Sequence, residues 1–205
     1  IKIEIEPSLI EAFNVDGKQI GLPTGVYSSF IYYNKDLFDK AGVGPPPAET
    51  PMSWEEFREK AEQLTDPGAK EYGFVEQPVF DFMVPWLWSG GGDYMNAAQT
   101  VCTLDTPESI AAMEFVIGMI TDNIAAPVTD LANPSFAVEE FYGGKIGMHV
   151  DGPWQFINIR ENSDFEWDVA PLPVTAGTLV TSASASRRAA LGSALARRTA
   201  PRLLG

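Results

Sequence analysis

The chain has very few of the residues on which metal and thiol chemistry depend. Its 205 residues include one cysteine, Cys102, and one histidine, His149. This excludes an internal disulfide and also a His/Cys zinc site within a single chain. We therefore expect neither a metal nor another cofactor. We interpret Cys102 as a small half-buried residue rather than a nucleophile, and His149 as a satisfied or surface side chain.

Basic residues and long apolar runs are also scarce. The chain has 28 acidic residues against 14 basic ones, for a net charge of −14, which argues against nucleic acid and anionic membrane surfaces as partners. No apolar run reaches the roughly 20 residues of a membrane span, so we expect this segment not to insert into a membrane. No leader pattern is present either, and we expect any export signal to lie outside this chain.

What the sequence does contain is a regular alternation of strand and helix signals. The β-branched and aromatic run from 29 to 33 predicts a strand, after which Asn34 is placed to cap a helix that Gly42 ends. An Asp16-Gly17 hairpin comes earlier in the chain. Similar signals predict helices beginning near residues 53, 106 and 133, and strands at 72–75, 145–150 and 166–170. This alternation predicts an α/β fold.

Helical spacing also predicts which side chains are buried. In the helix after residue 106, the predicted core stripe consists of Ile110, Met113, Ile117 and Ile120. Trp86 and Trp88 lie about 200° apart around a helix, at about 100° per residue, so we expect only one of them to be in the core. We place Trp86 in the core and Trp88 at the wall of a cleft.

Three blocks of sequence carry a family resemblance. They are Gly17-Lys18 with Gly21-Leu22-Pro23 and the run 32–42, then the block 141–154 ending in Gly152-Pro153-Trp154, then the strand ending in Pro171-Leu172-Pro173. In this order they resemble the extracytoplasmic solute-binding proteins of ABC importers, in the maltose-binding-protein-like branch that carries sugars and oligosaccharides. After about residue 173 the resemblance decays, and residues 174–205 contain no acidic or aromatic residue.

The resemblance implies a periplasmic-binding-protein-like, two-lobed α/β fold, of which this chain holds mainly the second lobe. Residues 1–26 would be the remainder of the first lobe and the hinge crossing, 27–176 the second lobe, and 177–205 a divergent, poorly packed Ala/Arg/Ser-rich tail. The implied function is capture of a sugar or oligosaccharide between the lobes and its delivery to an ABC permease in the membrane, without catalysis. We expect a monomer outside the cytoplasm, in the periplasm or as a lipoprotein.

Trp154 is the first candidate for ligand contact. It follows a Gly-Pro turn at a helix start, where a ring can overhang a cleft rather than enter a core, and the resemblance implies that this tryptophan stacks on the sugar. Sugar sites combine aromatic faces with paired polar groups. Thr24, Gly25 and Tyr27 occupy the hinge-crossing loop, where relatives place polar contacts, and Tyr27 offers either a second stacking face or a hydroxyl.

Asp81 and Phe82 fall where relatives hold a contact residue at a helix start. Asp81 could accept two sugar hydroxyls, although a solvated helix acid is an equally good interpretation. Asp151 either contacts the ligand or caps the helix that begins near Trp154, and we favour the cap.

Two rival interpretations remain open. A carbohydrate-active hydrolase would need two carboxylates about 5–9 Å apart, and Glu76, Asp81 and Asp151 are candidates that no motif places opposite each other. The other rival is a truncated, non-functional product. Because a two-lobed cleft needs both lobes, we expect this chain alone to bind ligand weakly or not at all.

Overall fold

The structure is a computed structural model that describes residues 10, 13–15, 17–21, 29–77, 79–98 and 100–175, with the backbone alone at Val15 and Asp81. Thr24, Gly25, Tyr27 and the tail after residue 175 therefore lie outside the described residues. The elements, in chain order, are β1 (Asn14–Val15), β2 (Lys18–Gln19), β3 (Phe30–Asn34), α2 (Lys35–Ala41), α3 (Trp54–Leu64), β4 (Tyr72–Val75), α4 (Phe80–Ser89), α5 (Pro107–Thr121), α6 (Phe136–Tyr142), β5 (Ile146–Asp151), α7 (Gln155–Asn162) and β6 (Trp167–Ala170).

The strands form two sheets. β1 and β2 make the expected hairpin, with Val15 paired to Lys18 and Gly17 at a φ of 75°. The main sheet has the order β4-β5-β3-β6, in which β4 and β5 are parallel and β3 is antiparallel to both β5 and β6. The carboxyl ends of β4, β5 and β6 therefore lie beside the start of β3, and we call this side of the sheet the carboxyl edge.

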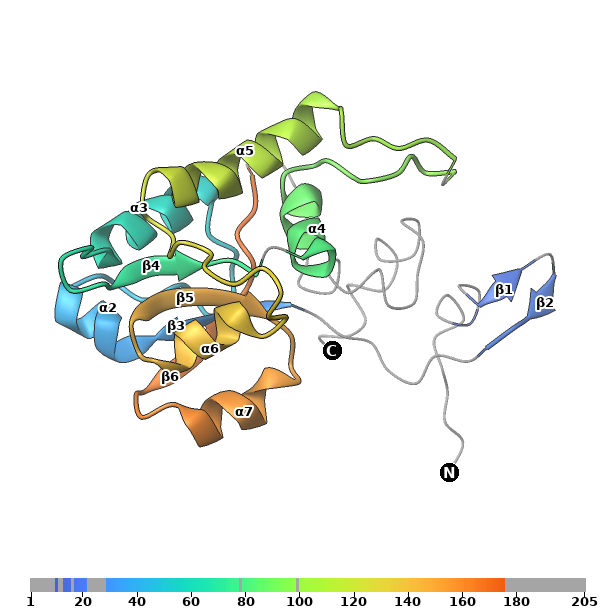
Figure 1. The fold of residues 1–205 in the computed structure, drawn as a ribbon. Coiled ribbons are helices and arrows are strands. Elements are labelled where there is room, and N and C mark those ends of the chain that lie inside the picture. Colours follow the sequence, from blue (N-terminus) through green and yellow to red (C-terminus); the bar gives the residue numbers. More distant parts are fainter. Residues whose placement is uncertain are drawn as a thin grey trace.

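Helices cover both faces of the main sheet. α3 and α5 lie over one face, and α6 and α7 lie over the other (Figure 1). The first face packs a large aromatic and aliphatic cluster that includes Phe57, Phe74 and Trp86, while the second packs a smaller cluster that includes Tyr32 and Phe141. The predicted α/β fold is confirmed. No helix among the described residues is long and apolar enough to span a bilayer.

The predicted helix starts at Asn34, Ser53 and Thr106 are confirmed by their caps. The Asn34 side-chain oxygen accepts the N–H of Leu37 at 3.1 Å, and the Ser53 hydroxyl accepts the N–H of Glu56 at 3.0 Å. Thr106 caps α5 in the same way, with a proline at the first helical position. Each cap satisfies an amide that the first helical turn leaves without a partner.

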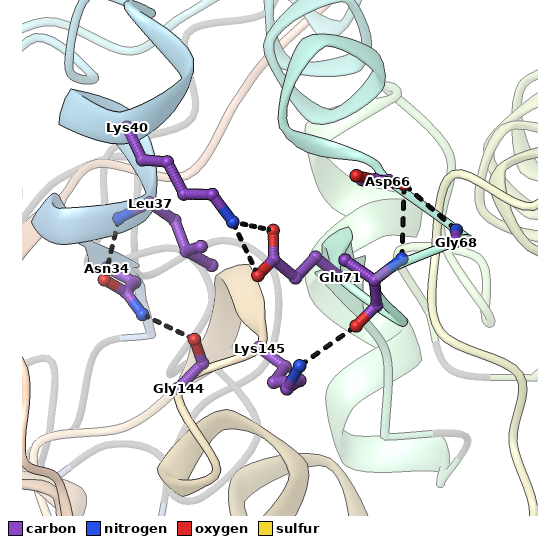
Figure 2. Close-up of polar contacts among 9 residues, drawn as sticks. Asn34, Leu37, Lys40, Asp66, Gly68, Glu71, Gly144 and Lys145 are labelled. Carbon is purple, nitrogen blue, oxygen red and sulfur yellow. Dashed lines mark hydrogen bonds and ion pairs between the residues drawn. The ribbon is translucent and has the colours of Figure 1, made fainter.

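Polar contacts hold the edge of the sheet opposite to the carboxyl edge. Figure 2 shows Asn34 capping α2 while its amide donates to the carbonyl of Gly144, just before β5, at 3.2 Å. Lys40 donates to both oxygens of Glu71 at 2.8 and 2.7 Å. These contacts tie the end of β3 and helix α2 to the starts of β4 and β5.

The predicted core stripe of α5 is wrong at two positions. Ile110 is 45 % exposed and Ile117 is 53 % exposed, and the residues buried by α5 are Ser109, Ala112, Val116 and Met119. The helix is apolar around most of its circumference, so tertiary contacts decide which face is buried. One such contact is Gly92, where an added Cβ would lie 2.6 Å from the Ser109 hydroxyl oxygen.

The prediction that only one of Trp86 and Trp88 is buried is also wrong. Trp86 is 1 % exposed and Trp88 is 7 % exposed. The indole N–H of Trp88 donates to Asp93 at 3.0 Å, and its ring lies 6.4 Å from that of Tyr94. The segment after α4 thus folds back over the side of the helix that periodicity assigned to a cleft.

Candidate functional site

Among the described residues, Trp154 is the most exposed aromatic side chain at the carboxyl edge. It follows β5 through the turn at Gly152 and Pro153 and is the N-cap residue of α7. Its side chain is 50 % exposed. The indole also lies directly over Gly152, where an added Cβ would come within 2.2–2.5 Å of three ring atoms. One face of the ring is therefore backed by the main chain, and the indole is kept out of the core, as the Gly-Pro turn predicted.

Asp81 and Phe82 lie at the same edge. They belong to the first turn of α4, which follows the carboxyl end of β4. Phe82 is partly buried. Phe80 is 43 % exposed and packs edge-to-face on Tyr94 at 5.4 Å. The topology thus brings the start of α4 and the start of α7 to one side of the sheet, because both follow parallel neighbouring strands.

Asp151 is buried, with an exposure of 2 %. One carboxylate oxygen accepts the N–H of Gly152 at 2.7 Å, and the other lies 3.2 Å from Nε2 of His149. The expected cap on α7 is wrong, because no side chain caps that helix and the Asp151 carboxylate is directed toward β5 instead.

His149 is 1 % exposed and not on the surface. Its Nε2 has Asp151 as a partner, whereas Nδ1 has no hydrogen-bond partner among the described residues. The expectation of a satisfied histidine is therefore confirmed at one nitrogen and wrong at the other.

Tyr32 completes this buried polar group from the neighbouring strand. Its hydroxyl donates to the carbonyl of Gly152 at 2.6 Å. Burial, reinforced by the charge of Asp151, raises the pKa of Tyr32. The hydroxyl therefore stays protonated and available as a donor at neutral pH.

Glu76, immediately after β4, is also buried. Its Oε2 accepts the indole N–H of Trp86 at 2.6 Å, and Oε1 has no hydrogen-bond partner among the described residues. Burial raises the pKa of Glu76 well above 4.5, although the hydrogen bond from Trp86 acts in the opposite direction. Glu76, packed under α4, therefore holds its proton more tightly than an exposed glutamate does.

These contacts argue against a hydrolase that uses Glu76 and Asp151. Both carboxyl groups are almost completely buried, and the oxygens of Asp151 are engaged by the protein itself. A glycosidase pair must flank an accessible glycosidic bond. Among the described residues, no group of three or more histidine, cysteine, aspartate or glutamate side chains could hold a metal ion.

Sequence reasoning missed Tyr32 and the importance of Gly152 as a surface for the ring of Trp154. The hydroxyl and carbonyl that meet are 120 residues apart. No local pattern reveals their contact. The alternation of β5 does place His149 and Asp151 on one face, which is the one signal that could have linked those two residues.

Comparison with known proteins agrees with this architecture. The family model described as "Bacterial extracellular solute-binding protein" matches residues 4–196. A Brucella abortus (strain 2308) protein, named only as a binding protein, is 32% identical over 181 residues, which cover 84% of this chain and 41% of that protein. An arabinooligosaccharide-binding protein of Halalkalibacterium halodurans is 31% identical over 127 residues, which are 62% of this chain and 27% of that protein.

Among solved structures, an ABC substrate-binding protein from Listeria monocytogenes in complex with cycloalternan superposes with a TM-score of 0.75 and 29% sequence identity. The match covers 84% of this chain and 44% of that one. The chain thus spans less than half the length of the relatives that it matches, which is about one lobe of a two-lobed fold. It belongs to the bacterial extracellular solute-binding protein family.

Proposed function

We propose that this chain supplies one lobe of an ABC importer's solute-binding protein, which captures a sugar or oligosaccharide and delivers it to a membrane permease. No bond is made or broken, and the protein works outside the cytoplasm as a monomer. Residues 1–26 belong to the other lobe and the hinge crossing in this proposal, residues 27–176 form the lobe described above, and residues 177–205 are an appended tail. Relatives that bind an arabinooligosaccharide and cycloalternan support the ligand class.

The observation that carries the proposal is the half-exposed indole of Trp154 at the carboxyl edge. A sugar ring presents C–H groups on its faces and hydroxyls around its rim, so it needs a flat apolar surface beside polar groups. Trp154 offers that surface, and Asp81 and Phe82 begin the neighbouring helix at the same edge. In the proposed cleft, Thr24, Gly25 and Tyr27 provide contacts from the hinge crossing. Trp88 and Asp151 are buried and support the site rather than line it.

The test is isothermal titration of arabino-oligosaccharides and cycloalternan into a protein of the relatives' full length that includes this chain. A dissociation constant near 1 μM corresponds to about −8 kcal/mol. We expect Trp154→Ala to weaken binding by about tenfold or more, as for a central aromatic anchor. The matched control is Ile117→Ala, which removes a side chain of similar exposure from α5 and should bind like the wild type. Equal loss in both variants would count against a site at Trp154.

A second comparison addresses the missing half of the cleft. We expect this chain alone to bind weakly or not at all, and a protein of the relatives' full length that includes it to bind tightly. Equally tight binding by both would show that the site does not need two lobes. Release of reducing ends from the same oligosaccharides would instead favour a hydrolase.

A further inference from the structure

The main chain of Gly152 is held from both sides by buried side chains. Its N–H donates to Asp151 at 2.7 Å, and its carbonyl accepts the hydroxyl of Tyr32 at 2.6 Å and the backbone N–H of Gln155 at 3.1 Å. Asp151 is itself restrained by His149, whose Nε2 lies 3.2 Å from the second carboxylate oxygen. Neither polar group of this glycine is free to rotate without breaking a buried hydrogen bond.

Gly152 is also the surface on which the indole of Trp154 rests. A Cβ at position 152 would lie 2.2 Å from Cη2 and 2.3 Å from Cζ3 of that ring, well inside any tolerated contact. The ring can occupy its place only because position 152 has no side chain. The indole thus rests on the same residue whose N–H and carbonyl, in two successive peptide groups, are held by Asp151 and Tyr32.

We infer that Tyr32 and the Asp151–His149 pair are positioning residues that fix the Trp154 indole for ligand contact, an inference that rests on the proposed function. A side chain that must be ordered when ligand binds weakens the affinity, whereas one ordered in advance does not. The ring of Tyr32 makes contacts of its own, with Phe156 at 5.5 Å and Trp167 at 5.8 Å. The hydroxyl can therefore be removed while the ring packing is kept.

The experiment is ¹⁹F NMR of the chain labelled with 5-fluorotryptophan, recorded without ligand. The Trp154 resonance is assigned by its loss in Trp154→Phe. We expect Tyr32→Phe to shift or broaden it and to leave the resonances of Trp54 and Trp86, which pack on the other face of the sheet, unchanged. The control is Tyr33→Phe, which removes a hydroxyl from the adjacent residue of β3 and should leave the Trp154 resonance in place. An unchanged Trp154 resonance in Tyr32→Phe overturns the inference.

Two further variants test the carboxylate. Asp151→Asn keeps an acceptor for the N–H of Gly152 and should preserve the Trp154 resonance, whereas Asp151→Leu removes the acceptor and should move it. Should Asp151→Leu fail to fold, Tyr32→Phe still decides the matter. A Trp154 resonance that moves as much in Asp151→Asn as in Asp151→Leu would contradict the role of the hydrogen bond.

Titration separates this inference from the proposed function. With arabino-oligosaccharides and cycloalternan as probes on a protein of the relatives' full length that includes this chain, Tyr32→Phe should weaken binding by about two- to tenfold. Wild-type affinity in Tyr32→Phe overturns the inference while leaving the proposed function intact. Failure of every sugar to bind the wild type counts against the proposed function, and the resonance of Trp154 in Tyr32→Phe still tests the positioning.

Discussion

Replacing Glu76 by glutamine should stabilise the protein, increasingly so as the pH rises. The carboxyl is buried after β4 and accepts the indole N–H of Trp86 at 2.6 Å. An amide has nearly the same shape, and its oxygen can accept the same hydrogen bond. The variant therefore keeps the packing and replaces a group that can ionise by one that does not titrate.

The raised pKa of Glu76 decides how the free energy of unfolding of the wild type changes with pH. Above pH 4.5, the ordinary value, the unfolded chain loses this proton while the folded chain retains it. The wild-type free energy of unfolding therefore contains a contribution that is fully present below pH 4.5. It falls by about 1.4 kcal/mol per pH unit up to the folded-state pKa. Glutamine does not titrate, so its advantage over the wild type grows with the pH across this range.

The assay is urea unfolding followed by tryptophan fluorescence between pH 4 and 8, for the wild type and Glu76→Gln. The matched control is Glu114→Gln, which neutralises an exposed acid on α5 and should leave the pH profile parallel to that of the wild type. Parallel profiles for Glu76→Gln and the wild type would refute the reasoning, because they would mean that Glu76 has the same proton affinity in the folded and unfolded states.

Three other substitutions test the packing of the lobe. Gly73→Ala should destabilise the protein by about 3 kcal/mol or more in denaturant titrations. The new Cβ would lie 1.9 Å from the carbonyl oxygen of Ala61, a backbone atom of α3 that cannot move aside. A change below about 1 kcal/mol would contradict this close approach. Asn34→Ala should cost about 1–3 kcal/mol in the same measurement, since it removes a buried cap, and wild-type stability would show that the cap is dispensable. Lys40→Gln should change the stability by less than about 1 kcal/mol despite its two contacts with Glu71, because the lysine side chain is 61% exposed; a larger loss would mean that the pair is shielded from solvent.

The parts of the fold that could be predicted are those that depend on neighbours in sequence. The caps at Asn34, Ser53 and Thr106 each involve the amide three residues further along, so one short stretch contains both partners. The exposed indole of Trp154 was predictable for the same reason, since the Gly-Pro turn before it directs the chain away from the core.

The parts that could not be predicted depend on contacts between distant segments. The buried face of α5 is chosen by the loop at Gly92, because the helix has apolar residues on several sides. Trp88 is covered by residues that follow its own helix. The bond from Tyr32 to Gly152 requires the register of β3 against β5, which no single stretch of sequence encodes.

The most direct test of the account is the measurement of intermolecular NOEs between the C–H protons of a bound arabino-oligosaccharide and the tryptophan indoles, on a protein of the relatives' full length. Contact with Trp154 predicts NOEs to that indole and none to Trp54 or Trp86, which are buried on the other face of the sheet. Binding that produces no NOE to Trp154 would contradict the account.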